Sequence, residues 1–200
     1  MFTKVAENLK DLGYQVSIFD TKEHAADYLC DQIKDTTVGF GGSMTLREMG
    51  LYDRLGLTNT VHWHWLPQGD TTIPQTRMLA RDTEVYLSSV NGLAETGEII
   101  NIDGSGNRVA ETIFGHKKVY FVVGKNKLAE DYDKALWRAR NIAAPKNAFR
   151  LKTKTPCAEM GDQCYDCKSP ARICRALSVL WCAPTGSQYE VVLIKEDLGY

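Results

Sequence analysis

The chain has 200 residues, of which 44% are hydrophobic and 24% are charged, and its formal net charge is −1. This length suits one well-packed domain, which we place over residues 1–200. The nearly balanced charge excludes the strongly basic surface typical of proteins that bind nucleic acid or anionic membranes. No apolar run approaches the roughly 20 residues that span a bilayer, and the first residues lack the hydrophobic core of a signal peptide. We therefore expect a cytoplasmic protein with no nucleic-acid or membrane partner.

The hydrophobic periodicity alternates between helix and strand patterns along the chain. It predicts, in chain order, a helix over 3–12, a strand over 14–19, a helix over 22–34, a strand over 36–40, a helix over 46–55, a strand over 61–66, a helix over 74–81, a strand over 84–88, a hairpin over 97–112, a strand over 118–124, helices over 128–143 and 170–181, and a strand over 189–194. This alternation indicates an α/β fold with a largely parallel sheet flanked by helices. We expect the last strand to rejoin that sheet after a C-terminal cysteine-rich excursion, residues 153–175.

Three local signals fix the ends of these elements. Thr45 with Glu48 three residues later forms a capping box, which predicts where the helix over 46–55 begins. The glycine-rich run 103–107 predicts the turn of the hairpin. Ser169 followed by Pro170 is typical of an N-cap and first helical residue, so the last helix is expected to begin there.

A glycine loop, Gly39 to Thr45, lies between a buried strand and a capped helix. In open α/β sheets, ligands bind beyond the carboxyl ends of the strands. Gly41 and Gly42 would let a ligand approach the backbone N–H groups, and a helix N-terminus there would favour phosphate or carboxylate. The loop lacks the glycine spacing of NAD- or FAD-binding motifs and the Gly-Lys-Ser/Thr end of a Walker A loop. A tight structural turn is the alternative.

A second polar run, residues 91–98, follows the strand over 84–88 and is expected to face the glycine loop. Asn91 and Thr96 are the polar candidates for ligand binding there. Glu95 is the candidate catalytic residue, as a general base, acid or nucleophile, if burial raises its pKa. The alternative is a turn in which Glu95 caps a backbone amide.

His62 and His64 alternate with two tryptophans, so one face of a strand would carry both imidazoles. Such a pair can share a metal ion, and His64 could serve as an acid–base group near the glycine loop. A polar strand face is the commoner alternative. His116, just before the strand over 118–124, could reach the same pocket.

Four of the six cysteines, Cys157, Cys164, Cys167 and Cys174, have the spacing C-x6-C-x2-C-x6-C. Thiols stay reduced in the cytoplasm, so such a cluster favours metal binding or redox activity over disulfides. Four thiolates suit structural zinc or an iron–sulfur cluster, and the spacing does not decide between them. The alternatives are buried pairs of reduced thiols, or one Cys-x-x-Cys redox couple beside two core residues.

These motifs together resemble the LUD domain family, the lactate-utilization family that includes LutC-type proteins. The resemblance rests on the glycine loop with Glu48, the run from Asn91 to Gly97, the Gly104–Asn107 turn and His116. Towards the end, the segment from Thr155 to Cys174 and the closing stretch Val191 to Gly199 resemble a cysteine-bearing branch of that family. The similarity covers almost the whole chain.

The resemblance implies the NagB/RpiA/CoA-transferase-like fold, shared by glucosamine-6-phosphate deaminase, ribose-5-phosphate isomerase and CoA transferases. In that superfamily the glycine loop commonly binds the anionic part of a ligand, which implies a site at Gly41, Gly42, Ser43 and Thr45 with Glu95 across the pocket. LutC-like proteins are associated with the oxidation of lactate to pyruvate and with iron–sulfur redox partner proteins. The four-cysteine segment is not general among them.

Three functions follow from these features. The first is a LutC-like component of 2-hydroxy-acid utilization that binds a small anionic metabolite and works with redox partners. The second is a stand-alone isomerase, transferase or ligase for a phosphorylated or acyl substrate, with Glu95 as catalyst. The third is an iron–sulfur electron relay or redox sensor built on the cysteines. The substrate, the metal and the oligomeric state stay open, and an oligomer is compatible with the sequence.

Overall fold

The computed structural model describes residues 2–200. Its largest element is a six-stranded sheet in which every paired strand is parallel. In spatial order the strands are β1 (Gln15–Phe19), β10 (Gln188–Ile194), β7 (Lys118–Gly124), β4 (Val85–Ser88), β2 (Thr37–Phe40) and β3 (Thr60–Trp63). The last strand of the chain therefore lies inside the main sheet, as predicted, and the α/β fold class is confirmed.

A second, four-stranded sheet packs against the first. Its spatial order is β8 (Leu128–Ala129), β5 (Gly92–Ala94), β6 (Ile99–Asp103) and β9 (Ala176–Leu180). β5 and β9 both pair antiparallel with β6, whereas β8 runs parallel to β5. The sequence does not separate this sheet from the first, because its strands are short and come from distant parts of the chain.

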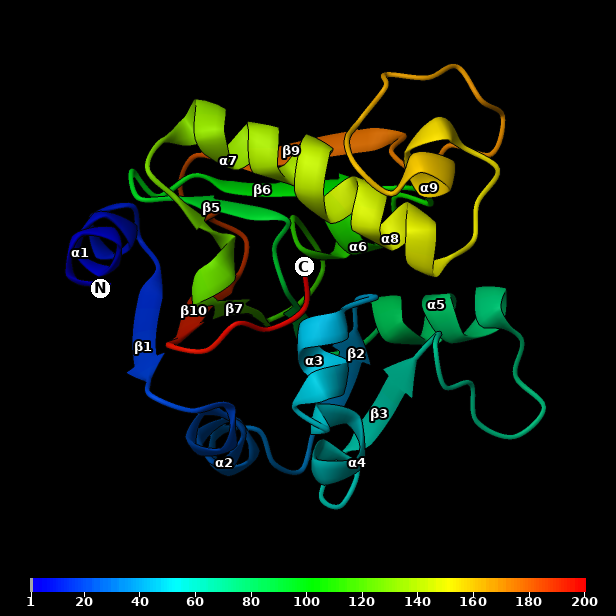
Figure 1. The fold of residues 1–200 in the computed structure, drawn as a ribbon. Helices are drawn as coiled ribbons and strands as arrows, with labels where there is room; N and C mark the ends of the chain where they lie inside the picture. The colour runs from blue at the N-terminus through cyan, green and yellow to red at the C-terminus, as the bar shows by residue number, and fades with distance from the viewer. Residues whose placement is uncertain (1) are drawn as a thin grey trace.

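Helices cover both sheets (Figure 1). Along the chain they are α1 (Thr3–Asp11), α2 (Lys22–Gln32), α3 (Met44–Glu48), α4 (Leu51–Leu55), α5 (Ile73–Arg81), α6 (Asn107–Glu111), α7 (Tyr132–Arg138), α8 (Ala144–Arg150) and α9 (Pro156–Met160). Figure 1 shows α7 and α8 over the second sheet, and α2, α3 and α4 on the far side of the parallel sheet. No helix within residues 2–200 combines the length and apolar character needed to cross a membrane.

The buried strand β10 shows how the sequence builds these layers. Successive strand residues point to opposite faces of a sheet. Val192 and Ile194 accordingly pack into the core formed with α2, α3 and α4, whereas Val191 and Leu193 join the core shared with α1 and the second sheet. A strand that is apolar on both faces must be covered on both, which is why β10 is an interior strand of the sheet, between β1 and β7.

Several predicted boundaries are wrong, each for a local reason. The helix expected over 46–55 is two short helices, because Gly50 adopts a φ of +62° between them. Ser43, and not Thr45, caps α3 by accepting a hydrogen bond from the Leu46 amide. The second arm of the predicted hairpin is helix α6, and the observed hairpin joins β5 to β6. The helix over 128–143 begins at Tyr132 and continues through a π-helical segment, Ala139–Ala143, into α8.

The predicted helix over 170–181 is also wrong. Residues 176–180 form β9 and pair with β6, and Cys174 lies in the loop before that strand. The Ser169 hydroxyl accepts a hydrogen bond from the Ala171 amide at 3.2 Å and donates one to the Lys154 carbonyl at 2.8 Å. It therefore closes a turn and ties the cysteine loop to the segment just before α9.

Replacing Gly39 in β2 by alanine should destabilise the protein by about 3 kcal/mol, the upper end for overpacking a close-packed core. A Cβ there would lie 2.5 Å from the Ala80 carbonyl oxygen and 2.7 Å from Thr83 Oγ1. Equilibrium urea unfolding measures the loss. Gly186→Ala is the matched control, because its Cβ would meet only the Phe114 ring, at 3.8 Å. Equal stability of the two variants would mean that α5 does not pack closely on β2.

Candidate functional site

A cleft of about 530 Å3 opens at the carboxyl ends of β2, β3 and β4. Its floor comes from the segments that follow these strands, and its walls come from α5, α6, α8 and the C-terminal residue Tyr200. Many of its lining side chains are polar or charged: Ser43, Arg47, His64, Arg77, Ser89, Asn91, Asp103, Ser105, Asn107, Arg108, Lys127, Asn147 and Arg150. This is the position at which open α/β sheets bind their ligands.

Lys127 lies at the bottom of the cleft and is only 3% exposed. Its ammonium group donates hydrogen bonds of 2.9 Å to Thr45 Oγ1 and to Ser89 Oγ. Burial, together with the nearby guanidinium groups of Arg138 and Arg108, lowers the pKa of Lys127 to about 7. Near neutral pH this amine therefore exists in both protonation states, which suits either anion binding or proton transfer.

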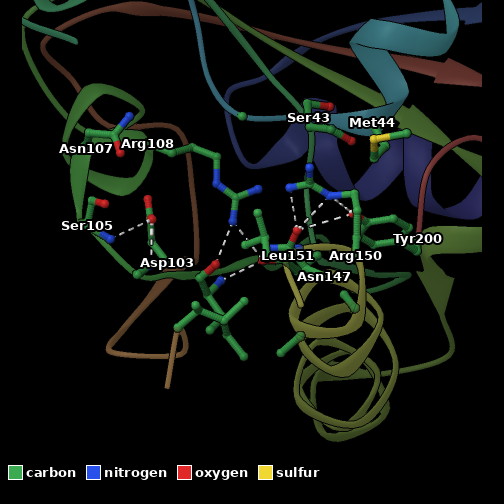
Figure 2. Close-up of a pocket in the computed structure, with 18 of the residues that line it drawn as sticks. Ser43, Met44, Asp103, Ser105, Asn107, Arg108, Asn147, Arg150, Leu151 and Tyr200 are labelled. Atoms are coloured by element: carbon green, nitrogen blue, oxygen red, sulfur yellow. Dashed lines mark hydrogen bonds between the residues drawn. The ribbon is translucent and has the colours of Figure 1, made fainter. Parts of the chain in front are cut away.

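Arg108 reaches into the cleft from α6 (Figure 2). Its Nη2 donates to Asn91 Oδ1 at 2.9 Å and to the Ile102 carbonyl at 2.6 Å. Nε and Nη1 have no hydrogen-bond partner among residues 2–200. Burial lowers the pKa of Arg108, although Asp103 opposes that shift. The guanidinium is thus held rigidly on one side and keeps donors available for a ligand.

Arg150 enters from α8, and Figure 2 shows it beside Asn147 and Tyr200. It donates to the Tyr200 hydroxyl at 2.6 Å and to Asn147 Oδ1 at 2.8 Å, and its guanidinium lies 4.6 Å from the ring centre of Trp65. These neutral partners orient the side chain without cancelling its charge.

Positive charge in the cleft is not balanced by the protein. Among residues 2–200, no carboxylate forms an ion pair with the cations that line the cleft, namely Arg47, Arg77, Arg108, Lys127 and Arg150. Asp103 is the one acidic side chain in the lining, and its oxygens accept backbone N–H bonds from Gly104, Ser105 and Val109. Lys127 is buried, Arg77, Arg108 and Arg150 are partly buried, and Arg47 is exposed. Buried charge without a partner is costly, so this arrangement favours an anionic ligand.

The wall formed by β3 and α5 adds two unpaired polar atoms. His64 Nδ1 and Arg77 Nε are buried and have no hydrogen-bond partner within the described part of the chain. Burial lowers the pKa of His64 to about 4, and the charge of Arg77 acts in the same direction, so its imidazole is neutral at pH 7. Both residues line the cleft, although these two atoms are themselves buried.

The predicted anion-binding residues mostly lie at this cleft. Gly42, Ser43 and Asn91 line it, and Thr45 lies below them as an acceptor for Lys127. Gly41 matters sterically, because a Cβ there would lie 3.1 Å from Cγ of Arg108. The helix that follows the loop, α3, has only five residues, so the charged side chains contribute more than its dipole.

Two predicted residues lie away from the cleft. Glu95 is paired with Lys4 of α1 at 3.1 Å, and its carbonyl accepts a hydrogen bond from Asn8. Thr96 is exposed and bonds to Glu98. Neither side chain lines the cleft, so a catalytic role for Glu95 and a binding role for Thr96 stay predictions that the geometry of the cleft does not support.

The other histidines also lie elsewhere. His116 is buried against Glu111, with Nε2 3.1 Å from Oε2, and its Nδ1 lies 2.7 Å from the Thr83 carbonyl. It does not reach the cleft, and it holds α6 against the start of β7. His62 points to the opposite face of β3 from Trp63 and is partly exposed.

The cleft cations Lys127, Arg108 and Arg150 were missed by sequence reasoning. Lys127 follows the most regular strand of the chain by three residues, which places it at the ligand-binding edge of the sheet, and that position was a usable signal. Arg108 follows the Gly104–Asn107 turn but was predicted to lie in a strand. Arg150 has no local signal, because only the packing of α8 brings it to the cleft.

The four clustered cysteines are reduced and partly buried, and all four line one small cavity next to the cleft. No group of three or more histidine, cysteine or acidic side chains within residues 2–200 is arranged to hold a metal ion as the chain stands. Cys30 and Cys182 lie elsewhere, and Cys182 is exposed. Metal binding by the four cysteines therefore stays a prediction.

A parallel six-stranded sheet flanked by helices, with a cleft at its strand ends, defines an α/β protein. The LUD domain family matches residues 2–194, and the chain belongs to that family. Its fold is similar to that of a DUF162 family protein from Deinococcus radiodurans, with 11% identity over 96% of this chain and 94% of that chain and a TM-score of 0.53. A ribose 5-phosphate isomerase from Plasmodium falciparum aligns with 16% identity over 55% of this chain and 52% of that chain, at a TM-score of 0.36. No curated protein matches the chain.

Proposed function

We propose that this LUD-domain protein binds a small organic anion of the 2-hydroxy-acid class in the cleft, as a component of lactate utilization that works with redox partner proteins. The observation that carries the proposal is the set of cleft cations without carboxylate partners, above all Arg108 and Lys127. A carboxylate placed between them would satisfy the free donors of Arg108 and stabilise the charged form of Lys127.

The 2-hydroxy group of such a ligand also has partners. Ser43, Ser89 and Asn91 line the same floor of the cleft and present hydroxyl and amide groups. A hydroxyl can donate to one of these groups and accept from another, so the site can distinguish a hydroxy acid from the corresponding simple acid. The family to which the chain belongs supports the choice of lactate among such acids.

A second candidate is an enzyme for a phosphorylated acid, and the charge of the cleft favours it. Five cationic side chains against one acidic side chain exceed what a ligand with a single negative charge neutralises. In this case Lys127 is the better catalytic candidate than Glu95, because its amine lies in the cleft and its pKa of about 7 suits proton transfer. Arg108 and Arg150 would then hold the phosphate.

The two candidates can be separated by calorimetric titration of the protein with L-lactate, D-lactate and phosphoglycolate, which carries a phosphate beside its carboxylate. We expect lactate to bind, and lactamide, its neutral amide, to fail because it lacks the charge that the cleft selects. A ligand at a hundred times its Kd stabilises the folded state by about 2.7 kcal/mol, so a thermal shift provides an independent readout.

Each outcome has one meaning for the proposal. Binding of lactate without lactamide supports the 2-hydroxy-acid proposal. Binding of phosphoglycolate alone supports the second candidate and overturns the first. Lactamide binding as tightly as lactate would show that charge does not determine recognition, which contradicts both.

A further inference from the structure

The four clustered cysteines come together from separate segments. Cys157 lies on α9, Cys164 and Cys167 lie in the loop that follows it, and Cys174 lies two residues before β9. All four line a single small cavity of about 20 Å3. Thiols that line a common cavity without forming disulfides are typical of metal coordination.

The surroundings of the sulfurs suit a negatively charged group. Cys164 Sγ accepts a hydrogen bond from the Asp166 amide at 3.4 Å and a longer one from Arg140 Nη2 at 3.9 Å. Thr155 Oγ1 lies 3.4 Å from Cys157 Sγ. Hydrogen bonds to sulfur and nearby positive charge stabilise iron–sulfur clusters bound by thiolates.

Charge around the cavity has the same sign throughout. Arg140 and Arg172 line it, and no acidic residue does. Asp166 pairs with both arginines but is 75% exposed, so it faces solvent and not the cavity. The cavity can therefore accommodate the net negative charge of a cluster with four thiolate ligands.

The spacing of the sulfurs favours a cluster over zinc. A single zinc ion needs all four sulfurs about 2.3 Å from one point, and no group of cysteines within residues 2–200 is arranged to hold a single ion. In a cluster with four iron atoms each thiolate binds a different iron, so the sulfurs stand farther apart around a common centre. Four cysteines that share a cavity without converging on one point fit that geometry better.

The cysteine cavity and the ligand cleft share a wall. Cys174, Ile173 and Ala144 line both of them. Ala144 begins α8 directly after the π-helical segment, and π-helical turns are frequent at functional sites. Whatever the cysteines bind therefore lies next to whatever the cleft binds.

We infer that Cys157, Cys164, Cys167 and Cys174 bind one iron–sulfur cluster, and that its Cys174 edge forms part of the wall of the anion-binding cleft. The second half of this inference rests on the proposed anion site. The first half stands on the cysteine cavity alone.

The cluster is tested on the full chain, expressed and purified without oxygen. We expect iron, acid-labile sulfide and a broad visible absorption band in the wild-type protein and in Cys182→Ser, whose cysteine is exposed and outside the cavity. Cys157→Ser and Cys167→Ser should each lose most of the iron and sulfide. Bound zinc without sulfide, or cluster content unchanged in both variants, would overturn the inference.

The shared wall is tested by electron paramagnetic resonance of the reduced cluster, with binding measured separately by calorimetry. Adding L-lactate or inorganic phosphate should shift the spectrum of the wild type and of Cys182→Ser. A probe that binds by calorimetry and leaves the spectrum unchanged would refute the shared wall while leaving the anion site intact.

If neither probe binds, the proposed function fails, and Ala144→Asp still tests the position of the cluster. A carboxylate at the shared wall should lower the midpoint potential of the cluster, because it disfavours the added electron. Ala110→Asp, on the exposed side of α6, should leave the potential unchanged. Equal potentials in the two variants would contradict the shared wall.

Discussion

Replacing Lys127 by methionine is expected to raise the stability of the free protein by about 2 kcal/mol while removing most of its affinity for anions. A pKa shift of one unit corresponds to about 1.4 kcal/mol, and burial lowers the pKa of this lysine from 10.5 to about 7. The lost hydrogen bonds to Thr45 and Ser89 offset part of that gain, at about 1 kcal/mol each. Functional sites often carry such a cost to stability.

The same shift gives the stability a pH dependence of known sign. The folded protein binds the Lys127 proton with a pKa of about 7, whereas the unfolded chain binds it with the ordinary value of 10.5. Between these values the unfolded chain holds more protons, so the free energy of unfolding rises with pH, and the full penalty applies below about pH 7. Urea unfolding at several pH values between 6 and 10 measures this slope.

The control for this experiment is Lys125→Met, in the same 3-10 turn but outside the cleft. That variant should keep the wild-type slope, whereas Lys127→Met should lose the part due to residue 127. Arg138, Arg108 and Glu48 also influence the pKa of Lys127, and all three are unchanged in both variants. A stability profile that is the same in Lys127→Met as in the wild type would mean that Lys127 titrates as an ordinary lysine.

Binding should show the opposite pH dependence. An anion beside Lys127 stabilises the charged amine. Above about pH 7 the free protein has lost this proton, so anion binding requires Lys127 to take it up again. The affinity of wild-type protein for L-lactate should therefore fall by up to about tenfold per pH unit above neutrality.

The strands of the parallel sheet were predictable because their signal is local. Lys118–Gly124 is apolar on both faces and bounded by polar residues, and the structure gives β7 the same limits. The strand β9 was not predictable in this way. Residues 176–180 follow a helix-start signal, and only pairing with β6, far away in the sequence, makes them a strand.

The residues of the candidate site also differ in whether a local sequence signal places them at the cleft. Gly42, Ser43 and Asn91 follow strands directly, so strand ends alone placed them at the cleft. Glu95 was expected beside them, but the short strand β5 carries the chain into the second sheet after Asn91. The carboxylate of Glu95 consequently faces Lys4 of α1.

The charged part of the cleft is a property of the tertiary structure. Arg108 lies on α6, Lys127 follows β7, and Arg150 lies on α8. In the sequence, nothing distinguishes these three residues from ordinary charged surface residues. They form a cationic site only because three distant segments meet around a cleft that is lined by a single acidic side chain. A local motif cannot encode such a sum of charges.

Replacing Arg108 by methionine should weaken anion binding about 100-fold, because a charge-assisted hydrogen-bonding pair is worth up to about 3 kcal/mol. Methionine keeps much of the apolar volume of the side chain but removes the charge and the donors at Nε and Nη1 that face no partner within residues 2–200. Calorimetric titration with L-lactate measures the change. Lysine at this position retains the charge without the planar guanidinium, so Arg108→Lys should lose about tenfold.

Two further variants separate this role from a general effect on the fold. Arg81→Met removes an exposed arginine on α5 that pairs with Asp82, and it should bind lactate as the wild type does. Gly41→Ala should weaken binding without removing any charge, because its Cβ would lie 3.1 Å from Cγ and 3.3 Å from Cδ of Arg108 and would displace that side chain. If Arg108→Met instead binds lactate as tightly as Arg81→Met, the anion does not rest against Arg108, and the uncompensated charge of the cleft serves another ligand.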